Sequence, residues 1–400
     1  MGRENFKDII EMKDFMKNNP LSIFLNSLLS ILSYLIKKQK GTFLVGARFG
    51  KFFSENSKYL YLYANKIKNN DNFVWFTRNK SLFKRLKKEG LPVVYAFSFR
   101  GFYKILTSEK LIISSSPKEV SYFRYLFGNF KIIQLCHGNG IKNVDYLSPK
   151  SKSLIDYIRK YFIKKQYSKY DFLLHTSRKT KSIISKSFSN GKVILLGYPR
   201  NDFKKNTFYT YEDLEFIPSN KKIFLYAPTY RDVNTGKKPF QKKFLYKLNE
   251  LLKKKGYYLI MKNHFHDEVK GIGVSNLTKF ENILDISEKN LDIQELLQKV
   301  DILITDYSSS CFDFSLLKKP IIFYPYDYEQ YVLNCKKIII NYFKDLPGPF
   351  VKTEEELFDL ISDLSWSKRK SYLKKYEKFV ADFNDFKDSK SCERVYEKLV

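Results

Sequence analysis

An alternation of apolar runs and helical stretches can be followed in residues 300–324, VDILITDYSSSCFDFSLLKKPIIFY. It begins with an apolar run of strand length, VDILIT (300–305), and a polar turn then leads into a helical stretch that ends before Pro320. A second apolar run, PIIFY (320–324), follows. Continuous apolar strands joined by helices are typical of parallel sheets, because helices cover both faces of such sheets. The stretch therefore predicts a β–α–β unit.

The same alternation extends through most of the chain. Apolar runs of strand length are also present at 42–46, 72–77, 92–97, 110–115, 131–136, 171–176, 192–197, 221–227, 256–262 and 283–286. It pauses only in a polar stretch between Asn201 and Asn220. Because 400 residues are too many for one core, we expect an α/β protein with two Rossmann-like domains that face each other across a cleft. The expected parts are an N-terminal helical segment (1–40), a first domain (41–205) and a second domain with C-terminal helices (206–400).

The chain is strongly basic, with a formal net charge of +30 at pH 7. Only 12 of its 72 basic side chains are Arg, a balance closer to the codon bias of an AT-rich genome than to selection for bidentate phosphate contacts. The excess still favours anionic partners, namely acidic lipid headgroups, nucleotides or nucleic acid. The four cysteines are scattered without a CxxC pair. This spacing argues against a zinc module and a disulfide scaffold, and it fits a reducing compartment.

An uncharged stretch near the start, LSIFLNSLLSILSYLI (21–36), runs directly into Lys37, Lys38 and Lys40. As a helix it would be about 24 Å long, which is shorter than the ~30 Å hydrocarbon core of a bilayer. The helix could cap a domain, or it could lie in the membrane interface with its basic flank on lipid phosphates. A membrane span is the third alternative, although the helix is short for it. The residues before it are partly acidic and show no cleavage-site pattern, so we expect no secretory signal.

Ligands of open α/β sheets bind beyond the carboxyl ends of the strands, so the loops that follow the apolar runs are the places to search. The loop QLCHGNGIK (134–142) places His137 at a strand exit, where an imidazole can titrate near neutrality, and its glycines allow close approach to a ligand. A satisfied structural histidine is the alternative. The loop YAPTYRD (226–232) carries Arg231, which is either a fork for phosphate oxygens or a surface arginine in a turn.

Two further loops suggest anion binding. MKNHFHD (261–267) has alternating histidines followed by acidic residues, a pattern that could bind zinc or iron. No third ligand has convincing spacing, so phosphate binding by Lys262 and His264 is the simpler hypothesis. TDYSSS (305–310) opens a helix with three serines, which is either an anion site or an ordinary capped helix. The absence of a GxxxxGK[ST] sequence argues against a P-loop nucleotide hydrolase.

Together and in this order, the four loops resemble those of the CDP-glycerol glycerophosphotransferase family of teichoic-acid primases and polymerases. The family pattern is Q-x-W-H-G-T-P-x-K, Y-A-P-T-aromatic-R, K-x-H-P and I-T-D-Y-S-S, and this chain has QLCHGNGIK, YAPTYRD, KNHFH and LITDYSSS. Three more segments are similar: FFSENSKYLYLY (52–63), GYPRND (197–202) and LPGPFV (346–351). The resemblance covers about residues 40–360. The His–Gly pair is retained, whereas Cys136, Asn139–Gly140 and Phe265 depart from the family pattern.

The resemblance implies a GT-B-like fold, with the acceptor on the N-terminal domain and the nucleotide donor on the C-terminal one. It implies transfer of a polyol phosphate, in the first instance glycerol phosphate from CDP-glycerol, to a hydroxyl of a membrane-bound glycan or teichoic-acid acceptor, with release of CMP. His137 would be the general base, with Gly138 beside it, and Asn139 and Lys142 would lie on the acceptor side. The donor would be held by Arg231, Lys262, His264, Thr305, Asp306, Ser308 and Ser309.

We expect no cofactor and no divalent metal, because attack of an alcohol on the β-phosphorus of a CDP-polyol needs positioning, positive electrostatics and one base. The expected partners are the CDP-polyol, a lipid-linked acceptor and an anionic membrane surface, with the enzyme peripheral on the cytoplasmic face of the cell membrane. The alternatives are a GT-B glycosyltransferase that uses a nucleotide sugar and a nucleotide-sugar epimerase. A nucleic-acid binder would need a recognisable motif or a basic and aromatic face, and the sequence indicates neither.

Overall fold

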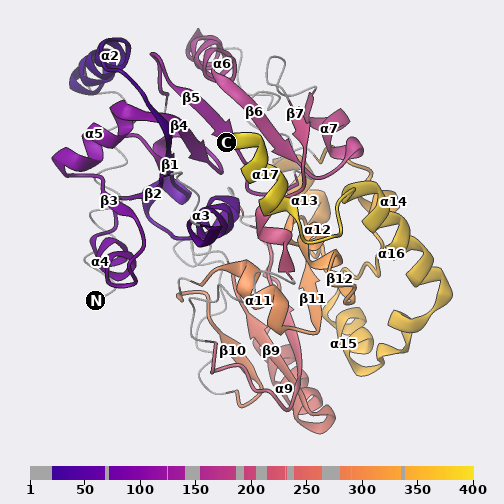
Figure 1. Cartoon of the computed structure of the whole chain (residues 1–400). Coiled ribbons are helices and arrows are strands. Elements are labelled where there is room, and N and C mark those ends of the chain that lie inside the picture. The colour runs from indigo at the N-terminus through magenta and orange to yellow at the C-terminus, as the bar shows by residue number, and fades with distance from the viewer. Residues whose placement is uncertain are drawn as a thin grey trace.

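The computed structural model describes residues 20–67, 72–123, 125–139, 154–185, 193–203, 214–229, 231, 238–263, 280–289, 291–334 and 338–400. Two parallel sheets, each wrapped by helices, organise these residues (Figure 1). This is the expected α/β, GT-B-like fold class. All twelve strands coincide with apolar runs of the sequence, to within a few residues at their ends.

The first sheet has seven parallel strands in the order β3-β2-β1-β4-β5-β6-β7. Its strands are β1 (Gln39–Val45), β2 (Asn72–Thr77), β3 (Val93–Tyr95), β4 (Ser108–Ile113), β5 (Lys131–Gln134), β6 (Tyr170–His175) and β7 (Val193–Leu195). The helices of this part are α2 (Pro20–Leu35), α3 (Glu55–Ile67), α4 (Lys80–Lys88), α5 (Phe99–Thr107), α6 (Leu154–Tyr167) and α7 (Arg178–Ser185), with the 3-10 turns η1 (Arg48–Gly50), η2 (Pro117–Glu119) and η3 (Pro199–Asn201).

The second sheet has five parallel strands in the order β10-β9-β8-β11-β12. Its strands are β8 (Lys222–Tyr226), β9 (Tyr257–Met261), β10 (Ile283–Asp285), β11 (Ile302–Thr305) and β12 (Ile321–Phe323). The elements around it are α9 (Lys242–Lys255), α11 (Ile293–Lys299), α12 (Ser310–Ser315), α13 (Tyr328–Asn334), α14 (Tyr342–Asp345), α15 (Glu354–Ser362), η5 (Leu364–Lys368) and α16 (Lys370–Phe383), and the last helix of the chain is α17 (Ser391–Leu399).

Local sequence explains why these elements form. Every residue of β11 is buried, as expected for a central strand covered on both faces. Helix α15 begins with a capping box in which Thr353 and Glu356 bond each other's backbone amides. Helix α9 ends at Gly256 with φ 68°, a left-handed conformation that glycine adopts without steric cost.

Both sheets reverse their direction of winding at one place, between β1 and β4 in the first and between β8 and β11 in the second. At such a switch point the adjacent loops leave the sheet in opposite directions and open a crevice at the carboxyl ends of the strands. The segments after β1, β4, β8 and β11 are therefore the places where the fold itself favours a ligand.

The two halves are joined through the end of the chain. Helix α17 packs beside α3 of the first half, and Val395, Tyr396 and Leu399 belong to its core (Figure 1). The carboxylate of Asp202 accepts bonds from the backbone amides of Ser391 and Cys392 at 2.8 and 2.7 Å, which fixes the start of α17. The predicted boundaries at 40/41 and 205/206 stay a prediction, but the last helix packs with the first sheet rather than the second.

Candidate active site

The loop after β5 meets the loop after β11. Gly138 approaches Ser309 so closely that a Cβ atom on Gly138 would lie 2.6 Å from the Ser309 hydroxyl and 3.0 Å from Nη2 of Arg200. The backbone of Gly138 has φ 148°, a conformation that other residues rarely adopt. The structure thus brings together the loop that carries His137 (the base loop) and the loop that carries Ser308 and Ser309 (the serine loop). In the sequence, 171 residues separate Gly138 from Ser309.

A Gly138→Ala change is therefore expected to damage the site more than the fold. The added methyl group has no room against Ser309 and Arg200, and the positive φ adds roughly 1–3 kcal/mol of strain. We expect transfer activity to fall about tenfold or more, while the far-ultraviolet circular dichroism spectrum stays unchanged. A Gly90→Ala change is the matched control, because Gly90 has φ 74° but nothing within 4 Å of the added atom. Equal activity losses in both variants would contradict the crowding at Gly138.

The imidazole of His137 is accessible, and one of its nitrogens is already oriented. Nδ1 lies 3.3 Å from the hydroxyl of Ser115, in the segment that follows β4. The backbone amides of Ser114 and Ser115 in turn donate to the carboxylate of Glu119. In the tautomer that a base needs, Nδ1–H donates to Ser115, so that the lone pair of Nε2 is left to accept a proton. Sequence reasoning missed Ser115 and Glu119, since no local pattern connects them to His137.

The surroundings of His137 favour its neutral form. Desolvation by the protein around the ring lowers the pKa of His137 below the usual 6.5, although the residue is accessible to solvent. Glu55 opposes the shift, whereas Arg200 and Arg48 add to it. Because an unprotonated imidazole is the form that accepts a proton, these neighbours suit His137 to general-base chemistry at neutral pH.

Strained backbone surrounds this histidine. Arg48 (40°), Glu55 (65°) and Cys136 (57°) are among the described residues that adopt positive φ although they are not glycine. Such conformations cost about 1–3 kcal/mol each and persist only when their surroundings hold them, which is most common at functional sites. Burial raises the pKa of the Glu55 carboxyl, but Arg48 and Arg200 together outweigh this effect and lower it to about 2, so Glu55 is an anion.

In the second domain, the guanidinium of Arg231 bonds to other groups of the protein itself. Its Nε and Nη2 donate to the carboxylate of Asp327 at 3.0 and 2.8 Å, and its Nη1 donates to Asp306 at 2.6 Å. The side chain is buried, and the rings of Tyr307, Tyr326 and Tyr331 lie about its guanidinium at 5.2–5.3 Å. The structure therefore favours a structural role for Arg231 over the predicted role as a phosphate ligand.

Thr305 and Asp306 are also used internally. The hydroxyl of Thr305 donates to the carbonyl of Ala227 at 2.7 Å, and Oδ1 of Asp306 accepts from the amides of Thr229 and Tyr307. Both residues are buried and join the loop after β11 to the loop after β8. These bonds shape the two loops, and the direct donor contacts predicted for Thr305 and Asp306 stay predictions.

Ser308 and Ser309 are the members of the predicted donor set that lie partly exposed beside the base loop. The hydroxyl of Ser308 accepts from that of Ser310 at 3.0 Å, and the hydroxyl of Ser309 makes no capping bond to α12. Lys262, directly after β9, is half-buried, and its ammonium donates to the carbonyl of Lys289 at 3.0 Å. Their roles as donor ligands stay predictions.

Of the two residues predicted for the acceptor side, the structure describes Asn139 but not Lys142. Asn139 is buried, and its side-chain oxygen accepts from the hydroxyl of Thr176 at 3.0 Å, so the structure favours a structural role for it. Lys142 and His264 lie outside the described residues. Within the described ranges, no group of three or more His, Cys, Asp or Glu side chains could hold a metal ion.

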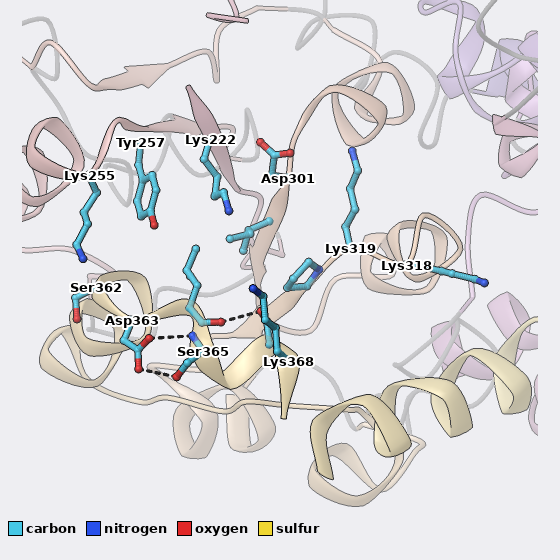
Figure 2. A pocket seen from close by; sticks show the side chains of 14 residues that line it. Lys222, Lys255, Tyr257, Asp301, Lys318, Lys319, Ser362, Asp363, Ser365 and Lys368 are labelled. Atoms are coloured by element: carbon cyan, nitrogen blue, oxygen red, sulfur yellow. Dashed lines mark hydrogen bonds between the residues drawn. The ribbon is translucent and has the colours of Figure 1, made fainter. Parts of the chain in front are cut away.

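A separate pocket of about 620 Å³ lies at the other end of the second sheet (Figure 2). Lys222 begins β8 and Lys255 ends α9, so the pocket opens at the amino ends of the strands, opposite the serine loop. Its two acids are already engaged, since Asp301 accepts from the amide of Ile223 and Asp363 from that of Ser365. None of the predicted active-site residues that the structure describes lines this pocket.

Comparison with known proteins gives the same family as the loops. The profile of the CDP-glycerol:poly(glycerophosphate) glycerophosphotransferase family matches residues 28–400. A teichoic acid poly(glycerol phosphate) polymerase of Bacillus spizizenii is 29% identical over 98% of this chain and 100% of that protein. A polymerase of the same name from Staphylococcus epidermidis is 28% identical over 86% of this chain, which spans only 48% of that longer protein.

Among solved structures, the wall teichoic acid polymerase TagF superposes with a TM-score of 0.76 at 24% identity, covering 100% of this chain and 98% of that one. A UDP-GlcNAc 2-epimerase from Neisseria meningitidis has a TM-score of only 0.51 at 14% identity, covering 91% of this chain and 99% of that one, so the epimerase is the more distant fold relative. The match to the family profile over almost the whole length shows that this chain belongs to the CDP-glycerol:poly(glycerophosphate) glycerophosphotransferase family.

Proposed function

We propose that this protein transfers glycerol phosphate from CDP-glycerol to a hydroxyl group of a teichoic-acid acceptor and releases CMP. The observation that carries the proposal is the close approach of the base loop to the serine loop at Gly138 and Ser309. His137 lies next to Gly138, its Nδ1 is oriented by Ser115, and its pKa is lowered. Family membership supports the donor, because the family is described by transfer from CDP-glycerol to poly(glycerophosphate).

The chemistry needs few groups. The acceptor oxygen attacks the β-phosphorus of CDP-glycerol, a new P–O bond forms, and the bond between that phosphorus and the oxygen of CMP breaks. His137 takes the proton of the acceptor hydroxyl through Nε2, while Ser115 holds Nδ1. Hydroxyl groups at Ser308 and Ser309 solvate phosphate oxygens without displacing the internal ion pairs of Arg231. Positioning and electrostatics supply most of the rate in such transfers.

The donor can be identified with a panel of CDP-glycerol, CDP-ribitol and UDP-sugars, with membrane extract as acceptor. CMP should be released from CDP-glycerol, and more slowly from CDP-ribitol if one hydroxyl pattern is selected; a poly(ribitol-phosphate) polymerase of Bacillus spizizenii is 26% identical to this chain, so ribitol is the natural competitor. Release of UDP from a UDP-sugar without release of CMP would instead support the glycosyltransferase alternative.

We also propose that the enzyme is peripheral on the cytoplasmic face of the membrane, where a nucleotide donor and a lipid-linked acceptor can meet. Helix α2 supports this location. One face of the helix packs on the first domain, where Leu29 is buried and Ser33 accepts from the amide of Asn129 at 2.8 Å. The other face leaves apolar side chains in solvent: Ile23, Phe24, Ile31, Tyr34 and Leu35 are exposed by 58–75%.

This exposed face fits a membrane interface better than a span. No helix among the described residues is both long and apolar enough to cross a bilayer. Helix α5 packs beside α2 (Figure 1). Phe99, which begins α5, is a further exposed apolar side chain, at 86%. Of the basic flank, Lys37 and Lys40 are exposed, whereas Lys38 donates to the carbonyl of Leu106 and contributes less than the sequence suggests.

Replacement of Phe24 and Ile31 by Asp should therefore abolish co-sedimentation with vesicles that contain anionic lipid. Wild-type binding should weaken in high salt, because each basic residue near an anionic surface contributes about 1 kcal/mol and is screened by ions. Leu333→Asp is the matched control, since Leu333 is 81% exposed on α13, in the second domain. If the double variant still binds like wild type, α2 is not the membrane contact.

A further inference from the structure

We propose that Arg200 is a positioning residue that links closure of the two domains to the placement of the base His137. The inference rests on the function proposed above. It concerns a residue that was not among the site residues predicted from the sequence, although the GYPRND segment (197–202) that contains it was noted there.

The guanidinium of Arg200 contacts three groups from separate parts of the chain. Nη1 donates to the main-chain carbonyl of His137 at 2.8 Å and to Oε2 of Glu55 at 2.7 Å. Nη2 donates to Oδ2 of Asp313, in α12 of the second domain, at 2.5 Å. A guanidinium is planar and presents its donors at fixed angles, so the three contacts form together only in one placement of the side chain.

The main chain before His137 is held from a second side. Nδ2 of Asn56 donates to the carbonyls of Leu135 and Cys136 at 3.0 and 2.7 Å. Its Oδ1 accepts from the backbone amide of Arg200 at 3.2 Å, so Asn56 and Arg200 form one bracket around the base loop. Because Cys136 has φ 57°, the loop needs such a bracket to keep a conformation that it would otherwise leave.

The cross-domain partner of Arg200 is also fixed. Oδ1 of Asp313 accepts from Asn201 at 2.9 Å, and Oδ2 accepts from Gln294 at 2.9 Å. Asp313 lies in the helix that starts directly after Ser309. Arg200 therefore reaches from the base to the element that carries the serine loop, and separation of the domains would remove one of the three contacts that fix it.

A second ion pair joins the same domains without the base loop. The ammonium of Lys58, in α3, pairs with Asp292 at 3.2 Å and with Glu295, both at the start of α11. All three side chains are buried. Loss of either ion pair should destabilise the closed arrangement, but only loss of Arg200 should change the environment of His137.

The charged groups that face His137 allow the two effects to be separated. These groups are Glu55 from α3, Arg48 from η1 and Arg200 from η3, and the Ser114 backbone contacts the ring as well. Arg200 lowers and Glu55 raises the pKa of His137. The acid limb of the pH–rate profile is the range in which the rate falls because His137 becomes protonated. Removing the cation of Arg200 should move this limb to higher pH, and removing the anion of Glu55 should move it to lower pH.

The test is the pH dependence of kcat for CMP release from CDP-glycerol in four variants. Arg200→Gln should lower kcat by roughly 10²-fold, because a misplacement of about 1 Å can cost that much, and should shift the acid limb upward. Arg200→Lys keeps the charge without the fork, so kcat should fall while the limb stays near that of wild type. Glu55→Gln should shift the limb downward, and Lys58→Gln should lower the midpoint of thermal unfolding without shifting the limb.

Superimposable pH profiles of Arg200→Gln and wild type, with kcat within about threefold, would overturn the inference. If Arg200→Gln does not fold, Asp313→Asn removes the charge that Arg200 meets across the domains and leaves the contacts of Arg200 with His137 and Glu55 in place. It should lower kcat without shifting the limb, and an unchanged kcat would then overturn the inference. A wild-type protein that releases no CMP from CDP-glycerol would instead contradict the proposed function itself.

Discussion

Replacement of His137 by Gln is expected to lower the rate of CMP release by about 10²–10⁴-fold, the usual contribution of a general base. Gln has nearly the same length and can still bond Ser115, but it cannot accept a proton from the acceptor hydroxyl. Affinity for CDP-glycerol and the unfolding midpoint should change little, because the side chain is exposed and its effect belongs to the transition state. Single-turnover measurements beside donor titrations separate these quantities.

The pH dependence follows from the same group. Desolvation and the nearby Arg200 and Arg48 keep the pKa of His137 below 6.5, although Glu55 opposes them. A base is lost when it is protonated, so the wild-type rate should hold through neutral pH and fall only as the pH drops below 6.5. A His137→Gln variant that keeps more than about a tenth of the wild-type rate would show that another group is the base.

The second large effect concerns stability. Arg231→Met should lower the free energy of unfolding by about 3–5 kcal/mol, because the change leaves the buried carboxylates of Asp306 and Asp327 without their cation. Urea titration followed by tryptophan fluorescence measures this loss. Ser308→Ala is the matched comparison on the same side of the site, and it should alter the unfolding free energy by no more than about 0.5 kcal/mol while raising the KM for CDP-glycerol.

The two variants discriminate between the sequence interpretation and the structure. As a phosphate ligand, Arg231 would be dispensable for folding, and its loss would act on donor affinity alone. An Arg231→Met protein as stable as wild type but with much weaker CDP-glycerol binding would therefore contradict the structural role described here.

The fold could be predicted almost completely from local sequence, because the sequences of buried parallel strands are short continuous apolar runs. PIIFY became β12 and NFVWFT became β2 for this reason. The path of α17 could not be predicted in this way. Its packing against α3 depends on an amide–carboxylate contact between Asp202 and Ser391, 189 residues apart, and no periodicity reports such a contact.

The candidate site was predictable in its loops but less so in its side chains. A histidine or serine after an apolar run marks the carboxyl edge of a sheet, so His137 and Ser309 could be found. Position after a strand does not show whether a polar side chain points to a ligand or into the protein, so the sequence alone does not reveal the internal bonds of Arg231 and Asn139. Glu55 and Arg200 were missed because their partners lie far away in the sequence, although both fall in segments that resemble the family.

The most direct test of the central claim is the stoichiometry of one reaction: CDP-glycerol labelled in the glycerol moiety, membrane acceptor and the purified full-length protein, with CMP and acceptor-bound label measured together. One CMP should appear for each labelled glycerol phosphate joined to the acceptor, and both should disappear in His137→Gln. Release of CMP without incorporation, or incorporation that persists in His137→Gln, would contradict transfer by this site.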